Sequence, residues 1–569
     1  MIDVLAGEGM GIGATRLVER IAAISHNLEE TPVLFEPCES VENGGVLFLV
    51  PFLYEQGLFE YKNHYNAIRK GYYDINFIIL LLAFMYLSRI KNAEQLKHYK
   101  PGELGKIMGV DRVPEGKCLR KKVKEILSQH QAESWMNSMA KHWVEKEQTN
   151  IYYIVGHVQV YHGYKANLGR KHVAREKLCL PGMCEFWVNN ADGMPYIVVT
   201  GEVNEKLQEM ILTEIVPRLK ENIAIKIKQQ ELDADKDLPL FSLVFDREGS
   251  SGKFLKTLWE EHRVAAITYK KNVRDNWEEY RFCTHYVEVE GNKTEMDLAE
   301  QIIEIEGMAM REIRKKSEGG HQTSIITTNK KISTIYIAIK MFSRWNQENY
   351  FRYMRLDYDI DKLFQYTVEQ LDDNIMVVNP QYSRLSYHLK TLREKISRRE
   401  AGLFKLIDDN IYSTLDKNNF QKQSKLKEEI NEFKEKEKQL ITQRNQLNYK
   451  IKIKDMPLQN RYNKLHSESK LFLNIIKMIC YRAESAFVLL LSTDYKKKEN
   501  EARAFVKNIM KTKVDILPDY ESNTLTIALY SLATPRDNKA AKKLCQLLNE
   551  TETFYPGTTL RLLYKIASG

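Results

Sequence analysis

The chain has 569 residues, of which 43% are hydrophobic and 28% charged, and its 85 Lys and Arg against 76 Asp and Glu give a net charge of +9. This composition is typical of a globular protein with roughly three to four domain-sized units, and the mild positive charge permits a nucleic-acid partner without requiring one. The seven scattered cysteines indicate a reducing compartment rather than a disulfide framework, and no second Cys or His pair joins Cys179 and Cys184 in a zinc site.

Two further features argue against the membrane and secreted classes. The longest apolar run, Phe77 to Leu87, has about half the length of a bilayer-spanning helix, so it is predicted to be a buried helix. The segment Met1 to Arg16 lacks a basic start followed by an apolar stretch, which a secretory signal needs. We therefore expect a cytoplasmic protein without a membrane partner.

Residues 1–145 are predicted to form a helical region. Apolar residues recur every three or four positions over Tyr65 to Leu96 and over Pro114 to Gln129. At the start of the chain, Gly9-x-Gly11-x-x-Ala14 follows a short apolar run and resembles a dinucleotide-binding turn. Because no further strand–helix units follow it, an N-terminal turn without a cofactor is the favoured interpretation.

From residue 150 the apolar period changes to two, which indicates strands, and helical segments then alternate with strands. This order predicts a mixed α/β sheet. The expected strands are 151–155, 158–161, 196–200, 238–245 and 264–270, and the expected helices are 204–222 and 251–262.

The apolar pattern changes three times in the second half of the chain. Residues 271–331 break into short alternating pieces, which predict a β-rich insertion, and one long amphipathic helix is expected over Ser333 to Met354. Two heptad seams follow and predict either an antiparallel hairpin or an intermolecular coiled coil. They consist of Leu385, Leu389, Leu392, Ile396, Leu403 and Leu406, and of Leu426, Ile430, Phe433, Leu440, Leu447 and Ile451. The remaining residues, 456–569, are expected to pack back on the sheet.

A basic segment near residue 120 is a candidate DNA contact. The stretch Glu103 to Lys124 predicts two short helices, and the second carries Arg120, Lys121, Lys122 and Lys124, of which Arg120, Lys121 and Lys124 are the candidate DNA contacts. A helix-turn-helix places such a second helix in the major groove of DNA. A solvated basic face on a helical region explains the same residues equally well, so both interpretations stay open.

Two carboxylates are candidate metal ligands. Asp246 ends a buried strand, and ligands bind at the carboxyl ends of such strands. Glu348 is expected in mid-helix, with Arg344 and Arg355 on the same face. A carboxylate there can hold a hard metal ion while the arginines bind phosphates, although an ordinary salt-bridged helix face has the same pattern.

Several short runs occur in a fixed order along the chain. They are Ile151-Tyr-Tyr-Ile-x-Gly-His-Val-x-Val-Tyr-His-Gly163, Phe245-Asp-Arg-Glu-Gly249, Gly320-His-Gln-Thr-Ser-Ile-Ile-Thr-Thr328, Arg344-Trp-x-Gln-Glu-Asn-x-Phe351 and Ile476-Lys-Met-Ile-Cys-Tyr-Arg-Ala-Glu484. Together they resemble bacterial insertion-sequence transposases of the DDE superfamily, over about residue 45 to the end of the chain. The resemblance implies a ribonuclease H-like catalytic domain with a β-strand insertion domain.

The resemblance also implies roles for individual residues. The family signature Y-x2-R-x3-E-x6-K falls on Met341, Arg344, Glu348 and Arg355, so Arg and Glu are retained while Met and Arg replace Tyr and Lys. Asp246 and Glu348 would be catalytic and would bind Mg²⁺ or Mn²⁺, and the two arginines would contact DNA. Trp277, in the insertion, would stack on a base, although core packing is the favoured interpretation.

The chain departs from the family at the first catalytic aspartate, in the pattern I-x-Y-x-D-G-H. That position is Val155. Two-metal phosphoryl transfer needs carboxylates around both ions, so we expect a chain that folds but has lost most of its activity. Glu145, Glu147 and Asp192 are no obvious substitutes, because they lie outside the strand.

Three functional hypotheses follow. The first is a DDE transposase that binds terminal inverted repeats as a homodimer and performs metal-dependent strand cleavage and transfer on double-stranded DNA. The second is a non-catalytic DNA-binding protein derived from a transposase, and the third is a coiled-coil assembly protein. The expected location is the bacterial cytoplasm, at the nucleoid when DNA is bound.

The expected parts are a helical region (1–145), a ribonuclease H-like core (146–270 and 332–380), a β-rich insertion (271–331), a helical hairpin or coiled coil (381–455) and a C-terminal packing region (456–569).

Overall fold

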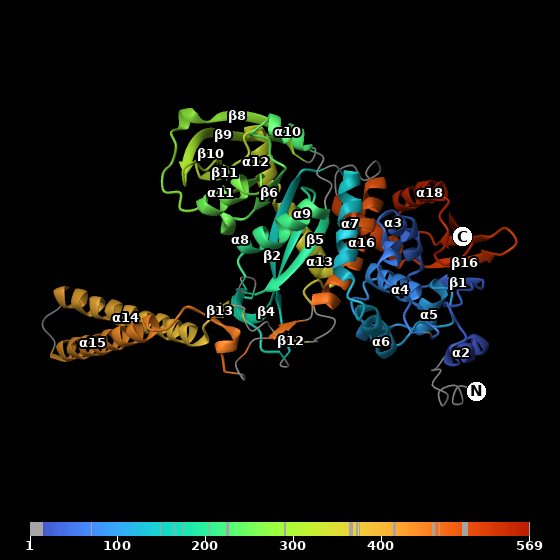
Figure 1. The fold of residues 1–569 in the computed structure, drawn as a ribbon, viewed down its shortest axis with the longest axis horizontal. Coiled ribbons are helices and arrows are strands. Elements are labelled where there is room, and N and C mark those ends of the chain that lie inside the picture. The colour runs from blue at the N-terminus through green and yellow to red at the C-terminus, as the bar shows by residue number, and fades with distance from the viewer. Residues whose placement is uncertain are drawn as a thin grey trace. The chain divides into compact units, whose positions relative to one another are not determined.

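A computed structural model describes most of the chain, and the residues divide into two compact units (Figure 1). The larger unit consists of 1–162, 169–366 and 466–569, and the smaller one of 163–168 and 367–465. The described residues are 15–69, 71–147, 149–163, 166–173, 176–203, 205–222, 227–289, 292–362, 368–370, 374, 376–412, 417–457, 461, 463–465, 467–491 and 499–567. The glycine-rich segment of residues 9–14 lies outside them.

The larger unit begins with a helical region, as the sequence predicted. Its central helix, α4, is buried at every residue except Asn76 and is capped by Asp74, whose carboxylate accepts a hydrogen bond from the Phe77 N–H at 2.9 Å. The predicted buried helix at Phe77 to Leu87 is therefore confirmed. The elements of this region are α2 (Leu17–Ile24), β1 (Cys38–Val41), η1 (Gly44–Leu49), α3 (Val50–Glu55), η2 (Leu58–Asn63), α4 (Ile75–Leu87), η3 (Ala93–His98), α5 (Pro101–Ile107), α6 (Gly116–Leu127) and α7 (Ala132–Glu147).

A large mixed sheet forms the centre of this unit, and it confirms the predicted α/β class. Five of its strands run in the spatial order β5-β4-β2-β6-β7; β5, β4 and β2 pair antiparallel, and β2, β6 and β7 pair parallel. The strands are β2 (Ile151–Val160), β3 (Arg170–Val173), β4 (Leu178–Asn189), β5 (Pro195–Glu202), β6 (Phe241–Phe245) and β7 (Val264–Tyr269). The two short strands predicted at 151–155 and 158–161 are one continuous strand, β2.

Helical segments connect the strands. The predicted helix at 204–222 is a helical run with a π-helical centre, in which α8 (Leu207–Met210), η4 (Ile211–Ile215) and α9 (Val216–Asn222) follow one another. Then come α10 (Gln229–Ala234) and, between β6 and β7, η5 (Arg247–Gly249) and α11 (Gly252–Glu260). Asn204, the first residue of the predicted helix, lies outside the described residues.

The β-rich segment at 271–331 extends the same sheet. Its last strand pairs antiparallel with β7, so the strand order continues as β7-β11-β10-β9-β8. The elements are η6 (Glu279–Arg281), β8 (Cys283–Val289), β9 (Asn292–Ile305), β10 (Met308–Lys316) and β11 (Gln322–Thr327). Trp277 is 6% exposed, and the guanidinium groups of Arg281 and Arg314 lie 4.6 and 4.3 Å from its ring centre, which supports core packing.

The single helix expected over Ser333 to Met354 is wrong, because the structure has two helices there. They are α12 (Thr334–Phe342) and α13 (Trp345–Tyr358). A turn at Ser343 and Arg344 separates them, in which the N–H groups of Asn346 and Gln347 donate to the carbonyls of Ser343 and Arg344 at 3.0 and 3.1 Å. Apolar spacing does not reveal so short a break, because the buried residues resume their helical spacing beyond it.

The C-terminal part of the larger unit joins the helical region to the sheet. The buried helix α16 packs on α3, α4, α7 and β5. The last strands form a separate sheet with the N-terminal strand, in the order β1-β16-β17-β18. The elements are α16 (Ser467–Leu490), α17 (Glu499–Lys511), β16 (Val514–Asp519), β17 (Thr524–Leu529), α18 (Pro535–Asn549) and β18 (Arg561–Ile566).

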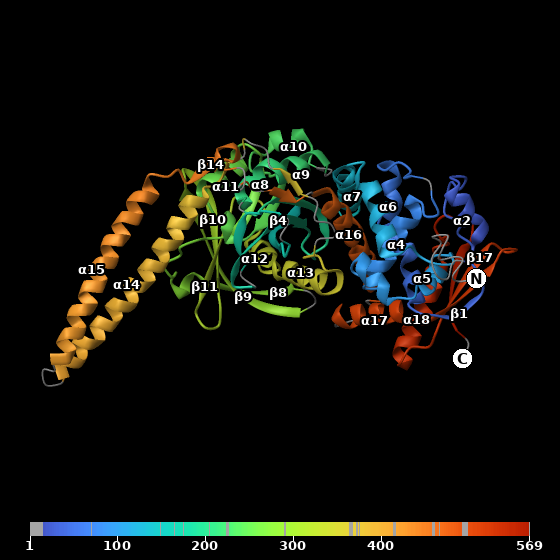
Figure 2. The ribbon, with the colours of Figure 1, turned by 90° about the horizontal axis from the view of Figure 1, so that it is seen from below.

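The smaller unit is an antiparallel helical hairpin with two short strand pairs at its base (Figure 2). The first heptad segment lies in α14 (Pro380–Tyr412) and the second in α15 (Lys417–Asn445), and the two helices pack along each other within the chain. Leu389, Ile396 and Ile430 are buried in their seam. Two residues predicted for the second seam lie beyond α15: Leu447, and Ile451 in the short strand at Lys450–Lys452. The strand pairs are β12 (Val368–Gln370) with β15 (Asn463–Leu465) and β13 (Met376–Val378) with β14 (Lys450–Lys452), and η7 (Ile453–Asp455) follows β14. In both units, none of the described helices is long and apolar enough to cross a membrane.

Candidate active site

The register of the central strands places Val155, Asp246 and Tyr269 side by side. Ile154 on β2 is the partner of Phe245 on β6, so the next residues along the two parallel strands are Val155 and Asp246. Val244 is the partner of Ile267 on β7, so Asp246 and Tyr269 are neighbours in the same way. Side chains in register on neighbouring strands point to the same face. Val155 therefore stands beside Asp246, the acidic residue that directly follows β6.

Asp246 is fixed by its own backbone environment. It precedes η5, and its carboxylate accepts a hydrogen bond from the Arg247 N–H at 2.7 Å. The Thr268 hydroxyl donates to the Asp246 carbonyl at 3.1 Å. The side chain is 51% exposed, so its free carboxylate oxygen is open to a ligand.

The start of α13 brings Arg344 and Glu348 to the same place. An Arg344 guanidinium nitrogen lies 3.7 Å from an Asp246 carboxylate oxygen. Arg344 precedes the first residue of α13, and Glu348 lies in the first turn of that helix rather than in mid-helix. A carboxylate near a helix N-terminus is favoured by the helix dipole. Glu348 is exposed.

Tyr269 is a member of this group that the sequence analysis missed. Burial raises the pKa of its hydroxyl, Arg344 lowers it, and Asp246 and Glu348 raise it further. All three charges are therefore close enough to act on one phenol group. Tyr269 ends the strand next to that of Asp246, so the strand-end argument that identified Asp246 would have found it too.

Gln347 holds the first turn of α13 in place and was also missed. It is 1% exposed, accepts a hydrogen bond from the Asn189 amide at 2.7 Å and donates to the Asn190 carbonyl at 2.8 Å. Asn189 ends β4, the strand next to β2. The residue beside Glu348 is thus fixed to the sheet that carries Asp246.

Replacing Gln347 with leucine is expected to lower the free energy of unfolding by about 1–3 kcal/mol, because the amide of Asn189 and the carbonyl of Asn190 lose a buried partner. Urea unfolding of the two chains measures the change. Asn349→Leu, two residues further along at an exposed position, is the matched control and should change stability by less than about 0.5 kcal/mol. Equal effects of both substitutions would contradict the role assigned to Gln347.

The acids close to β2 are engaged elsewhere or lie outside the strand. Glu147 pairs with Arg482 and accepts hydrogen bonds from the Tyr196 hydroxyl at 2.5 Å and the Asn190 amide at 2.9 Å. Glu145 is exposed on α7, and Asp192 is exposed in the turn between β4 and β5. Across the described ranges, no three His, Cys, Asp or Glu side chains come together as a metal site.

The other residues of the family signature lie along the same two helices. Met341 is fully buried in α12 and packs in a cluster with Tyr153 and Val244 beneath the site. Arg355 lies in the last turn of α13, where its Nε donates to the Phe351 carbonyl at 3.3 Å. Arg355 therefore shares the helix of Glu348 without touching Asp246.

The basic residues of α6 are not part of this group, because α6 packs on α4, η3 and α16. Lys121 and Lys124 are exposed, whereas Arg120 pairs with Glu94. The connection from α5 to α6 spans residues 108–115. It is longer than the turn of about three or four residues in a helix-turn-helix, so α5 and α6 do not have the spacing of that motif, and whether α6 contacts DNA stays a prediction.

A protein-family model described as "Transposase protein" matches residues 11–568, nearly the whole chain. No curated protein and no solved structure matches the chain.

Proposed function

The chain belongs to this family of transposase proteins, and from that premise we propose that it is a DDE-type transposase of an insertion sequence in which the first catalytic aspartate is replaced by Val155. Its ligand is double-stranded DNA, namely the terminal inverted repeats and the target. In this proposal the ribonuclease H-like core corresponds to the sheet around β2, β6 and β7, and the protein acts in the bacterial cytoplasm as a dimer on paired ends.

One observation carries the proposal. The position expected for the first aspartate lies next to Asp246 in the strand register, and Arg344 lies 3.7 Å from the Asp246 carboxylate at the start of the helix that carries Glu348. In the sequence, Asp246 follows Val155 by 91 residues, and Glu348 follows Asp246 by 102 residues. If the motifs occurred in the sequence by chance, nothing would lead these three residues to meet at one edge of a sheet.

The residues present fit a divalent metal ion only in part. Asp246 and Glu348 supply the carboxylate oxygens that Mg²⁺ or Mn²⁺ prefers, but Val155 supplies none. When bound in such a site, the metal ions stabilise the attacking and leaving oxygens of a phosphoryl transfer. The chain itself contributes Arg344 and Arg355 as phosphate contacts, and we infer that it binds DNA ends while strand cleavage and transfer need a third carboxylate.

A second candidate function therefore has a specific observation in its favour. A non-catalytic DNA-binding protein derived from a transposase keeps the fold and the basic residues while Val155 abolishes cleavage. The two functions differ in whether the unaltered chain nicks DNA in the presence of Mg²⁺ or Mn²⁺.

Charge reversal on α6 tests whether this helix contributes to the proposed DNA binding. Lys121→Glu with Lys124→Glu is expected to weaken binding to DNA that carries the gene's own flanking ends at least roughly tenfold, because two phosphate contacts become repulsive. The slope of log K against log salt should fall by about two. Fluorescence anisotropy at several salt concentrations measures both quantities.

The control for that test is Lys141→Glu, an exposed lysine on the neighbouring helix α7. It should change affinity by less than about threefold and leave the slope nearly unchanged. If the α6 variant behaves like this control while the unaltered chain binds DNA, α6 is only a solvated basic face. If the unaltered chain binds no DNA at any salt concentration, the proposed function itself is wrong.

A further inference from the structure

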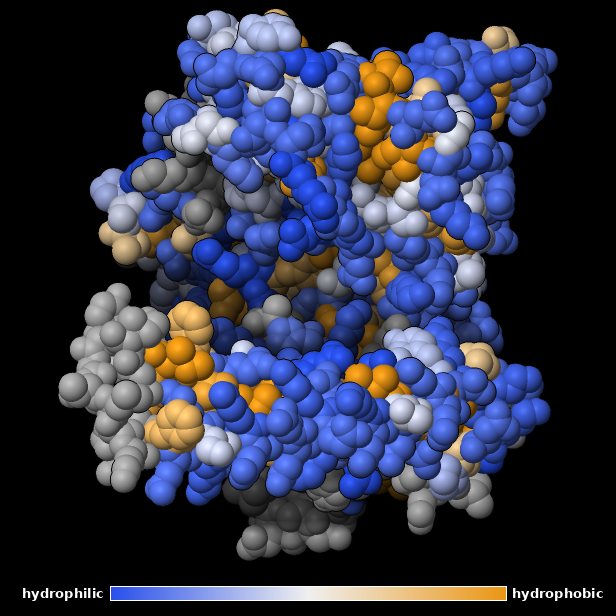
Figure 3. All heavy atoms as spheres, turned by 90° about the vertical axis from the view of Figure 1, so that its left-hand side faces the viewer, coloured by the Kyte–Doolittle hydropathy of each residue, from blue (hydrophilic) through white to orange (hydrophobic). Residues whose placement is uncertain are grey.

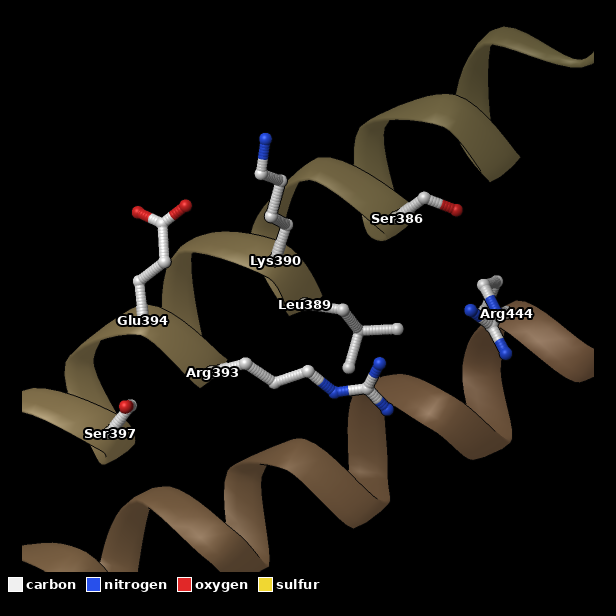
Figure 4. A pocket seen from close by; sticks show the side chains of 7 residues that line it. All are labelled: Ser386, Leu389, Lys390, Arg393, Glu394, Ser397 and Arg444. Atoms are coloured by element: carbon white, nitrogen blue, oxygen red, sulfur yellow. The ribbon is translucent and has the colours of Figure 1, made fainter. Parts of the chain in front are cut away.

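The helical hairpin of α14 and α15 distributes its charge unevenly about its seam. On one side of the seam, cations of each helix pair with acids of the other: Arg393 with Glu437 at 2.6 Å and Lys434 with Glu400 at 2.8 Å. That side also has a shallow groove of about 390 Å³, towards which Leu389 and Arg393 point (Figure 4). Arg393 and Lys434 are therefore compensated within the hairpin, whereas Lys390, which lines the groove, forms no ion pair with a described residue.

The opposite side carries cations that are not compensated. We call them the basic face; each is exposed, and within the described part of the hairpin none forms an ion pair. Its members are Arg384, Lys395, Arg398 and Lys405 on α14, and Lys422, Lys425 and Lys436 on α15. Hydrophilic residues predominate on the face of the molecule seen in Figure 3.

Helical spacing places these residues in two rows. Positions separated by 3, 7 or 11 residues lie on the same side of an α-helix, and the members on each helix are separated in this way. The ion pair of Arg399 with Glu429, at 2.8 Å, shows that the rows border each other. Arg399 lies one turn beyond Lys395, and Glu429 lies one turn beyond Lys425, so both rows flank the same side of the seam.

The basic face keeps an excess of positive charge. Among the described acids, Glu429 pairs with Arg399 beside this face, and Glu432 lies between its cations. Seven exposed cations against these two acids give the face a net positive charge, which attracts a polyanion.

The dimensions of the basic face fit duplex DNA. From Arg384 to Lys405 the helix rises roughly 32 Å at 1.5 Å per residue, close to the roughly 34 Å of one turn of B-DNA. DNA carries about one negative charge per 1.7 Å of its axis, and Lys and Arg on a rigid support neutralise such a row. We propose that the basic face is a second DNA-binding surface, which contacts the sugar–phosphate backbone of a duplex and reads no sequence.

This inference rests on the proposed function, because the family supplies DNA as the polyanion. The test uses the full chain with Lys395→Glu and Lys425→Glu, one substitution from each row. Its matched control is Lys390→Glu with Lys427→Glu, two exposed cations of the same helices that lie off the basic face. Both double variants change the net charge equally, so any difference between them reports position.

Binding is measured by fluorescence anisotropy on a duplex that carries the gene's end and about forty base pairs of flanking DNA, and on the same end without the flank. On the longer duplex, the basic-face variant should bind at least roughly tenfold more weakly than the control and lose about two units of salt slope. The double variant Lys395→Gln with Lys425→Gln should lose about half as much binding free energy. Because it removes the two charges without reversing them, it is less prone to misfold and checks the result.

Two outcomes would overturn the inference. If the unaltered chain binds DNA and the basic-face variant matches the control, the hairpin does not contact DNA, although the proposed function still holds. If the basic-face variant keeps its DNA affinity but loses self-association in analytical ultracentrifugation, the surface binds a second copy of the chain instead. Absence of any DNA binding by the unaltered chain would sink the proposed function, which is a different result.

Discussion

Val155→Asp is expected to convert the chain from one that does not detectably nick DNA into a metal-dependent nuclease for its own ends. The new carboxylate would stand beside Asp246 at the edge of the sheet, with Glu348 at the start of α13 as the third ligand. Carboxylates around the metal ions stabilise the attacking and leaving oxygens of the phosphodiester. We expect at least roughly a 100-fold gain in nicking rate with Mg²⁺ or Mn²⁺, equivalent to about 2.7 kcal/mol of barrier.

The substituted chain also offers a readout that does not depend on activity. Two neighbouring carboxylates repel each other when both are charged, so Val155→Asp alone should destabilise the fold. Mn²⁺ should restore stability to this variant and raise its melting temperature, because the ion binds the folded state. The unaltered chain should gain much less from the same concentration of Mn²⁺.

Three controls isolate the site. Val155→Asn introduces a side chain of nearly the same shape as aspartate but without its charge, so this variant should not nick DNA. Asp246→Asn or Glu348→Gln, each combined with Val155→Asp, should abolish the gained activity and leave DNA affinity within about threefold. If the unaltered chain and Val155→Asp nick equally well, another carboxylate completes the site, and Asp192 in the neighbouring turn is the first to substitute. If neither nicks while both bind the ends, the loss extends beyond position 155.

The second large effect is expected at Glu484, which lies in the C-terminal run that resembles the family. Its carboxylate accepts hydrogen bonds from Arg89 at 2.6 and 3.1 Å, from Tyr353 at 2.6 Å and from Tyr358 at 2.7 Å. The side chain is 1% exposed. These contacts tie the loop after α4 and the end of α13 to α16, so Glu484 joins the helical region to the helix that carries Glu348.

Glu484→Gln is expected to lower the free energy of unfolding by about 3–5 kcal/mol, because it leaves the Arg89 guanidinium buried without its main counter-charge. Denaturant unfolding near neutral pH measures the loss. Glu214→Gln removes a more exposed partner of Arg218 and should cost less than about 1 kcal/mol. Similar losses for the two substitutions would contradict the assigned role of Glu484.

The same carboxylate predicts a pH dependence with a definite sign. Burial raises the pKa of Glu484, but the Arg89 charge and the hydrogen bonds from Arg89, Tyr353 and Tyr358 outweigh it and hold the pKa below its usual value near 4.5. A carboxyl group with a lowered pKa in the folded state stabilises the fold above pH 4.5, and this stability is lost as the pH falls through the folded-state value. Between pH 6 and 3 the unaltered chain should therefore lose more stability than Glu484→Gln.

The sequence by itself determined the features that depend on local pattern. The buried helix α4, the two heptad helices and Asp246 at the end of its strand were all readable from apolar spacing, because side-chain burial in a helix or strand repeats with the local backbone period. The ordered motifs were enough to indicate a transposase, which the family match supports. The departure at Val155 was also visible at this level, because it is a single letter within a motif.

Only the tertiary structure decided which of these parts meet. Strand register set Asp246 between Val155 and Tyr269. The hydrogen bonds that Gln347 accepts from Asn189 and donates to the Asn190 carbonyl set the position of Glu348. The break before α13, the extension of the sheet through β11 and the pairing of β1 with β16 likewise depend on residues far apart in the chain. Local periodicity fixes which face of an element is buried, but the partner that covers that face is chosen by packing and hydrogen bonding between distant segments.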